Sequence, residues 1–350
     1  MARLVFLGTP VAAVAPLQAL VAAGHEVVLV VSRADKRRGR GGDLVPSPVK
    51  AAALELGLPV TDSLDGLAST GAELGVVVAY GRIIPSSVLE VLAMVNLHFS
   101  LLPRWRGAAP VERAILEGDA ETGVCLMAVE KGLDTGPIYA VGDTTIDETE
   151  SAEELRARLV GIGCRLLIDN LSDGAAGLPI PHDQVGDPSY AEKIRPEELE
   201  LRWERDAIYL SRVVRLGRAW TTFRGRRLRV LESAVEPWVE AGGVRTSATA
   251  GSAVSGGAME PGGETNPGGA MDPVGATNPG GEMEPGGATE PAGAAAAEGD
   301  SPGALHGEFV TAGEGTHLRL IRVQPEGKQP MSVSDWLRGA RPQASDRLGG

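Results

Sequence analysis

VNLHFSLLPRWRG, residues 95–107, opens with six residues that alternate between apolar and polar side chains. As a β-strand these six put three apolar side chains on one face and three polar ones on the other, namely Asn96, His98 and Ser100. A strand inside an α/β sheet is usually covered on both faces, so the polar face has two interpretations. Either the strand is half-exposed at a sheet edge, or the amide stabilises a developing oxyanion and the imidazole exchanges a proton near neutral pH.

The second half of this stretch ends the strand and carries a more specific pattern. Pro103 lacks the N–H that strand pairing needs, and residues 104–107 form a loop in which two arginines flank a tryptophan. Residues 96–110 resemble the signature of the formyltetrahydrofolate-dependent formyltransferases, and Trp-Arg-Gly-Ala-Ala-Pro at 105–110 resembles the methionyl-tRNA formyltransferase branch. For Arg104 and Arg106 the sequence leaves surface charge and substrate binding equally open.

The periodicity around this stretch predicts an α/β chain. Short apolar runs predict strands over 3–7, 25–31, 73–79 and 122–130, and helical spacing predicts helices over 11–23 and 151–171. Ser151 and Glu154 form a capping box at the start of the longer helix. Gly8 stands alone where a dinucleotide-binding turn needs three spaced glycines, so NAD binding is excluded.

The resemblance implies a Rossmann-like formyltransferase domain with a parallel-rich sheet, followed by a smaller OB-type β-barrel domain. With 350 residues the chain is long enough for both. We expect a catalytic domain over 1–188, a linker over 189–204 and the barrel over 205–340. We also expect a disordered insertion rich in Gly, Pro and Glu to interrupt the barrel at 241–305, and 341–350 to be a flexible tail.

The resemblance also assigns site residues. Asp134 lies in a glycine-flanked turn, where an aspartate is most often a turn former, but the Leu-Asp-Thr-Gly match makes it the third catalytic residue beside Asn96 and His98. Whether its carboxylate reaches the imidazole stays open at this point. The folate-binding segment that the resemblance implies consists of Ser100, Leu101, Leu102 and Pro103.

Residues 33–43 hold five cations and three glycines. Such a segment is either a solvated loop or a flexible wrap for a phosphate backbone. In the methionyl-tRNA formyltransferases an insertion at this point bears a Gly-Arg-Gly pattern and enters the acceptor arm of the tRNA, and Gly39-Arg40-Gly41 matches it. The resemblance therefore predicts tRNA contacts by Arg37, Arg38 and Arg40. Residues 201–235, where nine arginines are interleaved with Tyr209, Trp220 and Phe223, suit an RNA-backbone surface, although aromatic residues in a small barrel more often belong to its core.

The net charge of −13 argues against a nucleic-acid partner only until its distribution is considered. Residues 241–305 hold eight acidic residues against Arg245 alone, which accounts for −7 and leaves −6 for the rest. The two cysteines, Cys125 and Cys164, lie in apolar surroundings and fit a reduced cytoplasmic protein. We expect no metal site, no membrane span and a monomer.

These observations predict an enzyme that transfers the formyl group of 10-formyltetrahydrofolate to the amino group of initiator methionyl-tRNA, without a metal. Two alternatives stay open. A sister enzyme would act on an amino sugar nucleotide, on glycinamide ribonucleotide or on water, but would need neither the basic 33–40 loop nor an arginine-rich second domain. An RNA-binding protein without turnover would not need Asn96, His98 and Asp134 together.

Overall fold

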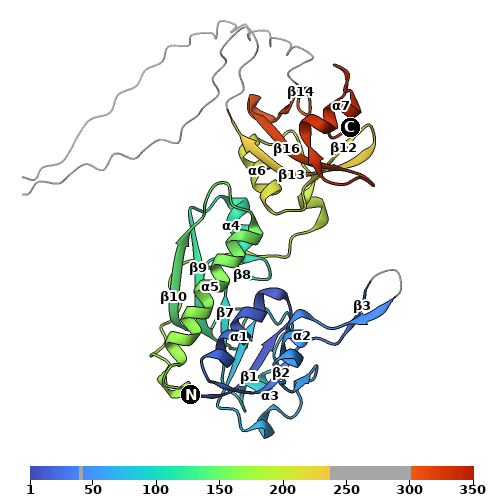
Figure 1. The fold of residues 1–350 in the computed structure, drawn as a ribbon. Helices are drawn as coiled ribbons and strands as arrows, with labels where there is room; N and C mark the ends of the chain where they lie inside the picture. The colour runs from blue at the N-terminus through green and yellow to red at the C-terminus, as the bar shows by residue number, and fades with distance from the viewer. Residues whose placement is uncertain (39–41, 237–300) are drawn as a thin grey trace, which may run out of the picture.

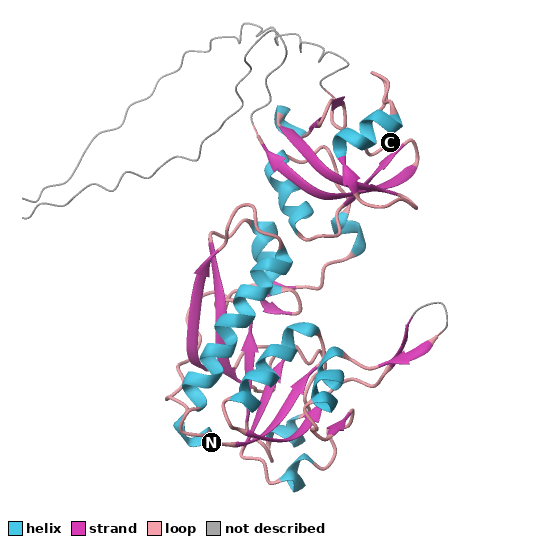
Figure 2. Ribbon diagram, viewed as in Figure 1, coloured by secondary structure: helices cyan, strands magenta, loops and turns pink. Residues whose placement is uncertain are grey.

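The computed structural model describes residues 1–38, 42–236 and 301–350. Its first domain is built on a seven-stranded sheet with the order β10-β9-β7-β6-β1-β2-β5 (Figures 1 and 2). These strands are β1 (Arg3–Gly8), β2 (Glu26–Val31), β5 (Val60–Thr61), β6 (Leu74–Val78), β7 (Met94–His98), β9 (Glu121–Ala128) and β10 (Ile138–Thr145). The five neighbouring strands β7, β6, β1, β2 and β5 pair in parallel. β9 pairs antiparallel with β7, and β10 pairs antiparallel with β9. The parallel-rich sheet predicted from the sequence is confirmed.

Helices and loops cover both faces of this sheet. On one face α1 (Val14–Ala22), α2 (Pro48–Glu55) and α5 (Ala152–Leu171) cover the main core, to which Leu4 and Phe6 of β1 belong. On the other face α3 (Ser86–Leu89) packs over a smaller core that includes Val5 and Leu7. Alternate residues of one strand thus enter two cores, which is why the central strands are apolar throughout. The predicted capping box begins α5, with the Ser151 hydroxyl accepting from the Glu154 amide N–H.

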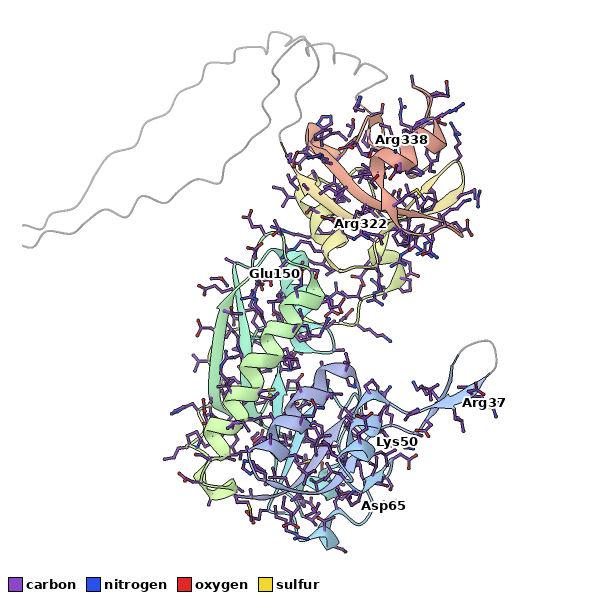
Figure 3. All side chains as sticks on the ribbon, in the orientation of Figure 1. Arg37, Lys50, Asp65, Glu150, Arg322 and Arg338 are labelled. Atoms are coloured by element: carbon purple, nitrogen blue, oxygen red, sulfur yellow. The ribbon has the colours of Figure 1, made fainter. Side chains whose placement is uncertain are left out.

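The basic segment forms a two-stranded hairpin rather than an irregular loop. Its strands, β3 (Lys36–Arg38) and β4 (Asp43–Val45), pair in antiparallel register and project from the body of the domain (Figure 1). Arg37 is exposed near the outer end of this hairpin (Figure 3). Arg40 lies outside the described residues. At the base of the hairpin Lys50 Nζ contacts Asp35 Oδ1 at 2.8 Å, which ties it to the first turn of α2.

A connecting stretch leads from the first domain to the second. Two short strands, β8 (Arg106–Gly107) and β11 (Tyr190–Ala191), pair in parallel and bring residue 190 next to the loop that follows β7. A 3-10 turn at Pro196–Leu199 follows, and then α6 (Ala207–Arg215). The connecting stretch is therefore anchored on the loop after β7 before the chain leaves for the second sheet.

The second domain is an antiparallel sheet with the order β12-β13-β16-β15-β14, and β17 pairs with β16 (Figure 2). Its strands and closing helix are β12 (Trp220–Phe223), β13 (Arg226–Val235), β14 (Leu305–His306), β15 (Phe309–Thr311), β16 (His317–Pro325), β17 (Met331–Ser332) and α7 (Val333–Ala340). The smaller β-domain expected from the sequence is confirmed.

The ends of the predicted insertion and of the chain need correction. Residues 301–305, expected in the disordered insertion, belong to the folded sheet, because Leu305 starts β14 and Ala304 is buried. The last residues are not the flexible tail expected for 341–350. Arg347 bridges Ala304, Leu348 bridges Phe223, and the Leu348 side chain is 3% exposed. This segment joins the two edges of the sheet, so the barrel is closed by the end of the chain. The remainder of the predicted insertion, residues 241–300, lies outside the described residues.

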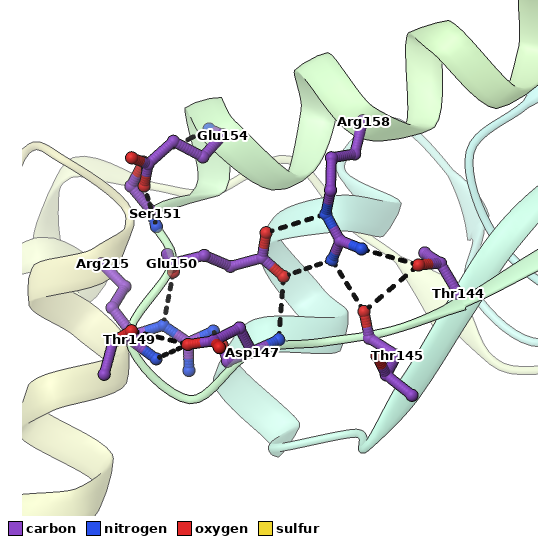
Figure 4. Close-up of polar contacts among 9 residues, drawn as sticks. All are labelled: Thr144, Thr145, Asp147, Thr149, Glu150, Ser151, Glu154, Arg158 and Arg215. Atoms are coloured by element: carbon purple, nitrogen blue, oxygen red, sulfur yellow. Dashed lines mark hydrogen bonds and ion pairs between the residues drawn. The ribbon is translucent and has the colours of Figure 1, made fainter.

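The two domains meet through arginine side chains (Figure 4). Arg215 of α6 donates from Nε to the Glu150 carbonyl at 2.7 Å and from a second guanidinium nitrogen to the Asp147 carbonyl at 2.7 Å. Arg113 of α4 (Pro110–Glu117) pairs with Glu198 at 2.7 Å. Among helices of the described part, none is long and apolar enough to cross a membrane.

Candidate functional site

Strand β7 positions the amide and the imidazole singled out in the sequence. Val95 and Leu97 enter the main core, so Asn96 and His98 point from the opposite face of the strand. β7 lies between β6 and β9, so the strand is central and the edge-strand interpretation of its polar face is wrong. The Asn96 side chain makes no hydrogen bond to any other described residue, which leaves its amide free to donate.

His98 is held by a hydrogen bond at one ring nitrogen, and Asp134 lies beside the other. The side chain is 5% exposed, and its Nε2 lies 2.8 Å from the backbone carbonyl oxygen of Trp105. A carbonyl oxygen can only accept, so Nε2 must carry a proton. Nδ1 lies 3.5 Å from Oδ2 of Asp134, so the carboxylate that the sequence could not place reaches the imidazole directly.

Asp134 is fixed by backbone contacts around it. Its backbone is left-handed, with φ of +51°, a conformation that aspartate tolerates better than most residues. The amide N–H of Gly107 donates to Asp134 Oδ2 at 2.8 Å, which links the loop after β7 to the turn after β9. Gly136 closes the turn, because an added Cβ would lie 2.1 Å from the Ala128 carbonyl oxygen.

Gln184 is a site residue that the sequence did not reveal. Its amide nitrogen donates to the carbonyl oxygens of Asp134 and Gly136, each at 2.9 Å. Its amide oxygen accepts from the Arg106 guanidinium at 2.6 Å. Gln184 therefore ties the turn that carries Asp134 to the loop that carries Arg106. It lies 50 positions after Asp134 and 78 positions after Arg106 in the sequence.

The predicted folate segment is largely internal. The Ser100 hydroxyl donates to the Arg104 carbonyl at 2.6 Å, and Ser100, Leu102 and Pro103 are buried, while Leu101 is half-buried. The Leu102 amide N–H donates to Cys125 Sγ at 3.4 Å, and burial raises the pKa of the Cys125 thiol to about 11. The thiol is therefore a structural partner of this segment and not a nucleophile.

A crevice for a ligand follows from the order of the strands. From β1 the chain winds to β2 and β5 on one side and to β6 and β7 on the other, so the order reverses between β1 and β6. In open α/β sheets ligands bind outside the carboxyl ends of the strands at such a point. Gly8 and the loop at 79–81 flank it here, and β7 with Asn96 and His98 is adjacent.

The two arginines of the 104–107 loop have partners within the protein. Arg104 Nε donates to Asp119 Oδ2 at 3.1 Å, and Arg106 bonds Gln184. The sequence left surface charge and substrate binding open for both arginines. In the structure each arginine instead forms a hydrogen bond within the protein. Within the described ranges no group of three or more His, Cys, Asp or Glu side chains is arranged to hold a metal ion.

The comparisons with known proteins agree with this fold. A family model described as "Formyl transferase" matches residues 2–171. A methionyl-tRNA formyltransferase from Jannaschia sp. (strain CCS1) is 38% identical over 356 residues, covering 97% of each chain.

Solved structures share the fold. A methionyl-tRNA formyltransferase from Clostridium thermocellum has a TM-score of 0.52 at 18% identity, covering 67% of this chain and 94% of its own. An N-formyltransferase from Helicobacter canadensis, solved with folinic acid and dTDP-3-aminofucose, has a TM-score of 0.54 at 18% identity, covering 68% of this chain and 89% of its own. The identity and coverage of the Jannaschia relative confirm the resemblance inferred from the sequence: the chain belongs to the methionyl-tRNA formyltransferase family.

Proposed function

We propose that this chain transfers the formyl group of 10-formyltetrahydrofolate to the amino group of initiator methionyl-tRNA. The observation that carries the proposal is the convergence of Asn96, His98 and Asp134 at the carboxyl end of β7, with Nδ1 of His98 3.5 Å from Asp134. The name of the 38% identical relative supports the same substrate, and the folinic acid bound in the Helicobacter structure supports a folate co-substrate.

Each member of the proposed catalytic set has a separate task. Attack of the amine on the formyl carbon puts negative charge on the formyl oxygen, and the Asn96 amide is the donor that can meet it, worth about 3 kcal/mol of barrier. The attacking nitrogen must lose a proton and the folate nitrogen must gain one, and Nδ1 of His98 is the nitrogen available for both transfers. Asp134 stabilises the imidazolium that forms between the two transfers.

Folate binding is proposed for the crevice between the ends of β1 and β6. Ser100, Leu101, Leu102 and Pro103 form one wall of it in this proposal. Because the Ser100 hydroxyl already has an internal partner and three of the four side chains are buried, we infer that they act through backbone groups and through the shape of the wall.

Recognition of tRNA is proposed for the hairpin and the arginine-rich sheet. Exposed Arg37 stands near the outer end of the hairpin, beyond the body of the domain (Figure 3). In the second domain Arg227 stacks on Trp220 at 4.2 Å from the ring centre, which holds a cation at the surface of β12 and β13. We infer that Arg37, Arg38 and Arg40 contact the acceptor arm while the second domain contacts the backbone elsewhere.

The test is formyl transfer from 10-formyltetrahydrofolate to methionyl-tRNA by the purified full-length chain, with free methionine as a control substrate. We expect activity only with the tRNA, loss of about a hundredfold or more in kcat for His98→Ala, and a raised KM for tRNA with little change in kcat for Arg37→Ala. No transfer to methionyl-tRNA, together with formyl release to water or transfer to a sugar amine, would replace this proposal by the sister activity.

A further inference from the structure

The loop residue that holds His98 has an unfavourable backbone. Trp105 adopts φ of +62°, a left-handed conformation that bulky L-residues rarely occupy. Its carbonyl oxygen accepts the proton of His98 Nε2 at 2.8 Å, so this conformation decides where the imidazole points. A backbone of this kind persists only where surrounding contacts hold it.

Two hydrogen bonds hold Trp105 in place, in addition to its packing against Ala114, Ala191 and Ile146. The indole Nε1–H donates to Asp119 Oδ2 at 2.6 Å, and the backbone N–H donates to Ser189 Oγ at 2.9 Å. The tryptophan is 8% exposed, so the indole N–H is withdrawn from bulk water and depends on the carboxylate for its hydrogen bond. The Ser189 contact belongs to the pairing of β8 with β11, whereas the Asp119 contact comes from the end of α4.

Asp119 stands where a carboxylate is electrostatically unfavourable. It follows Gly118, the C-cap of α4, and its own N–H donates to the Ala114 carbonyl at 3.0 Å, so it faces the negative end of the helix dipole. Its side chain is only 13% exposed. Both carboxylate oxygens receive donors, Oδ1 from Arg104 and Oδ2 from Arg104 and Trp105. The carboxylate is thus committed to the 104–105 loop and to no surface role.

We propose that Asp119 is a positioning residue that fixes the tautomer of His98. It acts through the Trp105 indole, which sets the loop, and the Trp105 carbonyl, which keeps the proton on Nε2 and leaves Nδ1 free to take one on the side of Asp134. Without this contact the loop relaxes, and the neutral ring moves its proton to Nδ1, from which the N–H can donate a hydrogen bond to the Asp134 carboxylate. This inference rests on the proposed role of His98 in formyl transfer.

The test compares variants that break the same contact from its two ends. Asp119→Ala removes the acceptor and Trp105→Phe removes the donor while keeping an aromatic ring. Asp119→Asn keeps an oxygen that can accept the indole N–H. Asp65→Ala is the matched control, because Asp65 is an exposed carboxylate in the loop after β5, the outermost strand on the other side of the sheet (Figure 3).

We expect Asp119→Ala and Trp105→Phe each to lower kcat by about tenfold or more, with KM for tRNA and for the folate within about twofold of wild type. Asp119→Asn restores kcat to within about threefold of wild type, and Asp65→Ala matches wild type. The double variant Asp119→Ala/Trp105→Phe loses no more than its worse parent, because both changes break one contact. Multiplied losses in the double variant, or losses confined to KM, would overturn the proposal.

A second readout is independent of turnover. Long-range ¹H–¹⁵N spectra of histidine side chains, recorded where the rings are neutral, report which nitrogen carries the proton, and His98→Gln identifies the signal among the five histidines. We expect Nε2–H in the wild type and a mixture of tautomers in Asp119→Ala. Nδ1–H in the wild type, or an unchanged spectrum in Asp119→Ala, would refute the positioning role. A wild type that does not formylate methionyl-tRNA would refute the proposed function instead, while the tautomer result would still stand.

Discussion

Asn96 is the residue on which the proposed stabilisation of the oxyanion depends. We expect Asn96→Ala to lower kcat by about a hundredfold to a thousandfold with little change in KM, because the donor acts on charge that develops only in the transition state. Asn96→Asp should be worse, because a carboxylate of the same shape repels the oxyanion. Steady-state kinetics with methionyl-tRNA measures both, and an Asn96→Ala variant that changed KM alone would remove Asn96 from the catalytic set.

Tyr80 is a residue whose replacement should stabilise the protein. Its side chain is 2% exposed, and its hydroxyl oxygen has no hydrogen-bond partner among the described residues. A buried hydroxyl without a partner costs about 1–3 kcal/mol, so Tyr80→Phe should raise the free energy of unfolding by about 1 kcal/mol. Urea unfolding of the two proteins measures the difference. A destabilised Tyr80→Phe would mean that the hydroxyl does have a partner, such as an ordered water.

The sequence brought out three of the site's residues and missed three others for a physical reason. Asn96, His98 and Asp134 stand in motifs, where residue type and local spacing carry the information. Asp119, Gln184 and Ser189 act through contacts with residues 14, 50 and 84 positions away, and such contacts leave no local pattern. The only local sign for Asp119 is an acidic residue directly after the C-cap of α4, where the helix dipole disfavours it.

Among the elements, those with strong periodicity or a cap could be predicted and those with mixed exposure could not. α5 was predicted with its capping box, and the central strands were predicted from continuous apolar runs. The β3–β4 hairpin was expected as a loop, because β3 consists of three cations and β4 is too short to show an apolar alternation. β10 was not predicted either, although Ile138, Tyr139 and Val141 favour a strand, because Gly142 and Asp143 interrupt the run.

The contact between α4 and the 196–199 turn predicts a pH dependence. Hydrogen bonds from Arg113 lower the pKa of Glu198 from 4.5 to about 2, so this carboxylate stays ionised in the folded protein after it would be protonated in the unfolded one. Its stabilisation is fully present above about pH 4.5 and is lost as the pH falls toward about 2. Because 22% of the Glu198 side chain is exposed, we expect about 1 kcal/mol and not the value of the full shift.

Glu198→Gln tests this element. At pH 7 its free energy of unfolding should lie about 1 kcal/mol below wild type, and the gap should close as the pH is lowered from 5 toward 2. Glu197→Gln is the matched control, because Glu197 is the exposed neighbour and forms no hydrogen bond or ion pair with Arg113 in the described part of the chain. A gap that is constant over this pH range would show that the loss comes from packing and not from the ion pair.

For the whole molecule, the fold class and the order of the two domains followed from the sequence, but the junction between them did not. A guanidinium bonded to backbone carbonyls has no sequence signature, because the carbonyls belong to every residue. Arg215 donates to the carbonyls of Asp147 and Glu150, while Arg158 holds the Glu150 carboxylate from α5 (Figure 4). The 147–150 turn, which binds Arg215 of the second domain, is therefore held in place by Arg158 of the first domain.

This junction predicts that the second domain can be loosened without touching the chemistry. Arg215→Met removes both donors to the 147–150 turn, so α6 and the sheet behind it lose part of their hold on the first domain, while Asn96, His98 and Asp134 keep their surroundings. If the second domain contacts tRNA as proposed, the substitution should weaken tRNA binding: KM for methionyl-tRNA should rise about tenfold with kcat near wild type.

Arg218→Met is the control that distinguishes a displaced second domain from the loss of one positive charge. Arg218 is an exposed cation three residues further along and makes no hydrogen bond to the described residues. An equal rise in KM for Arg218→Met would assign the effect to lost charge on the RNA-facing surface, and a fall in kcat for Arg215→Met would show that the second domain supports the catalytic loops directly.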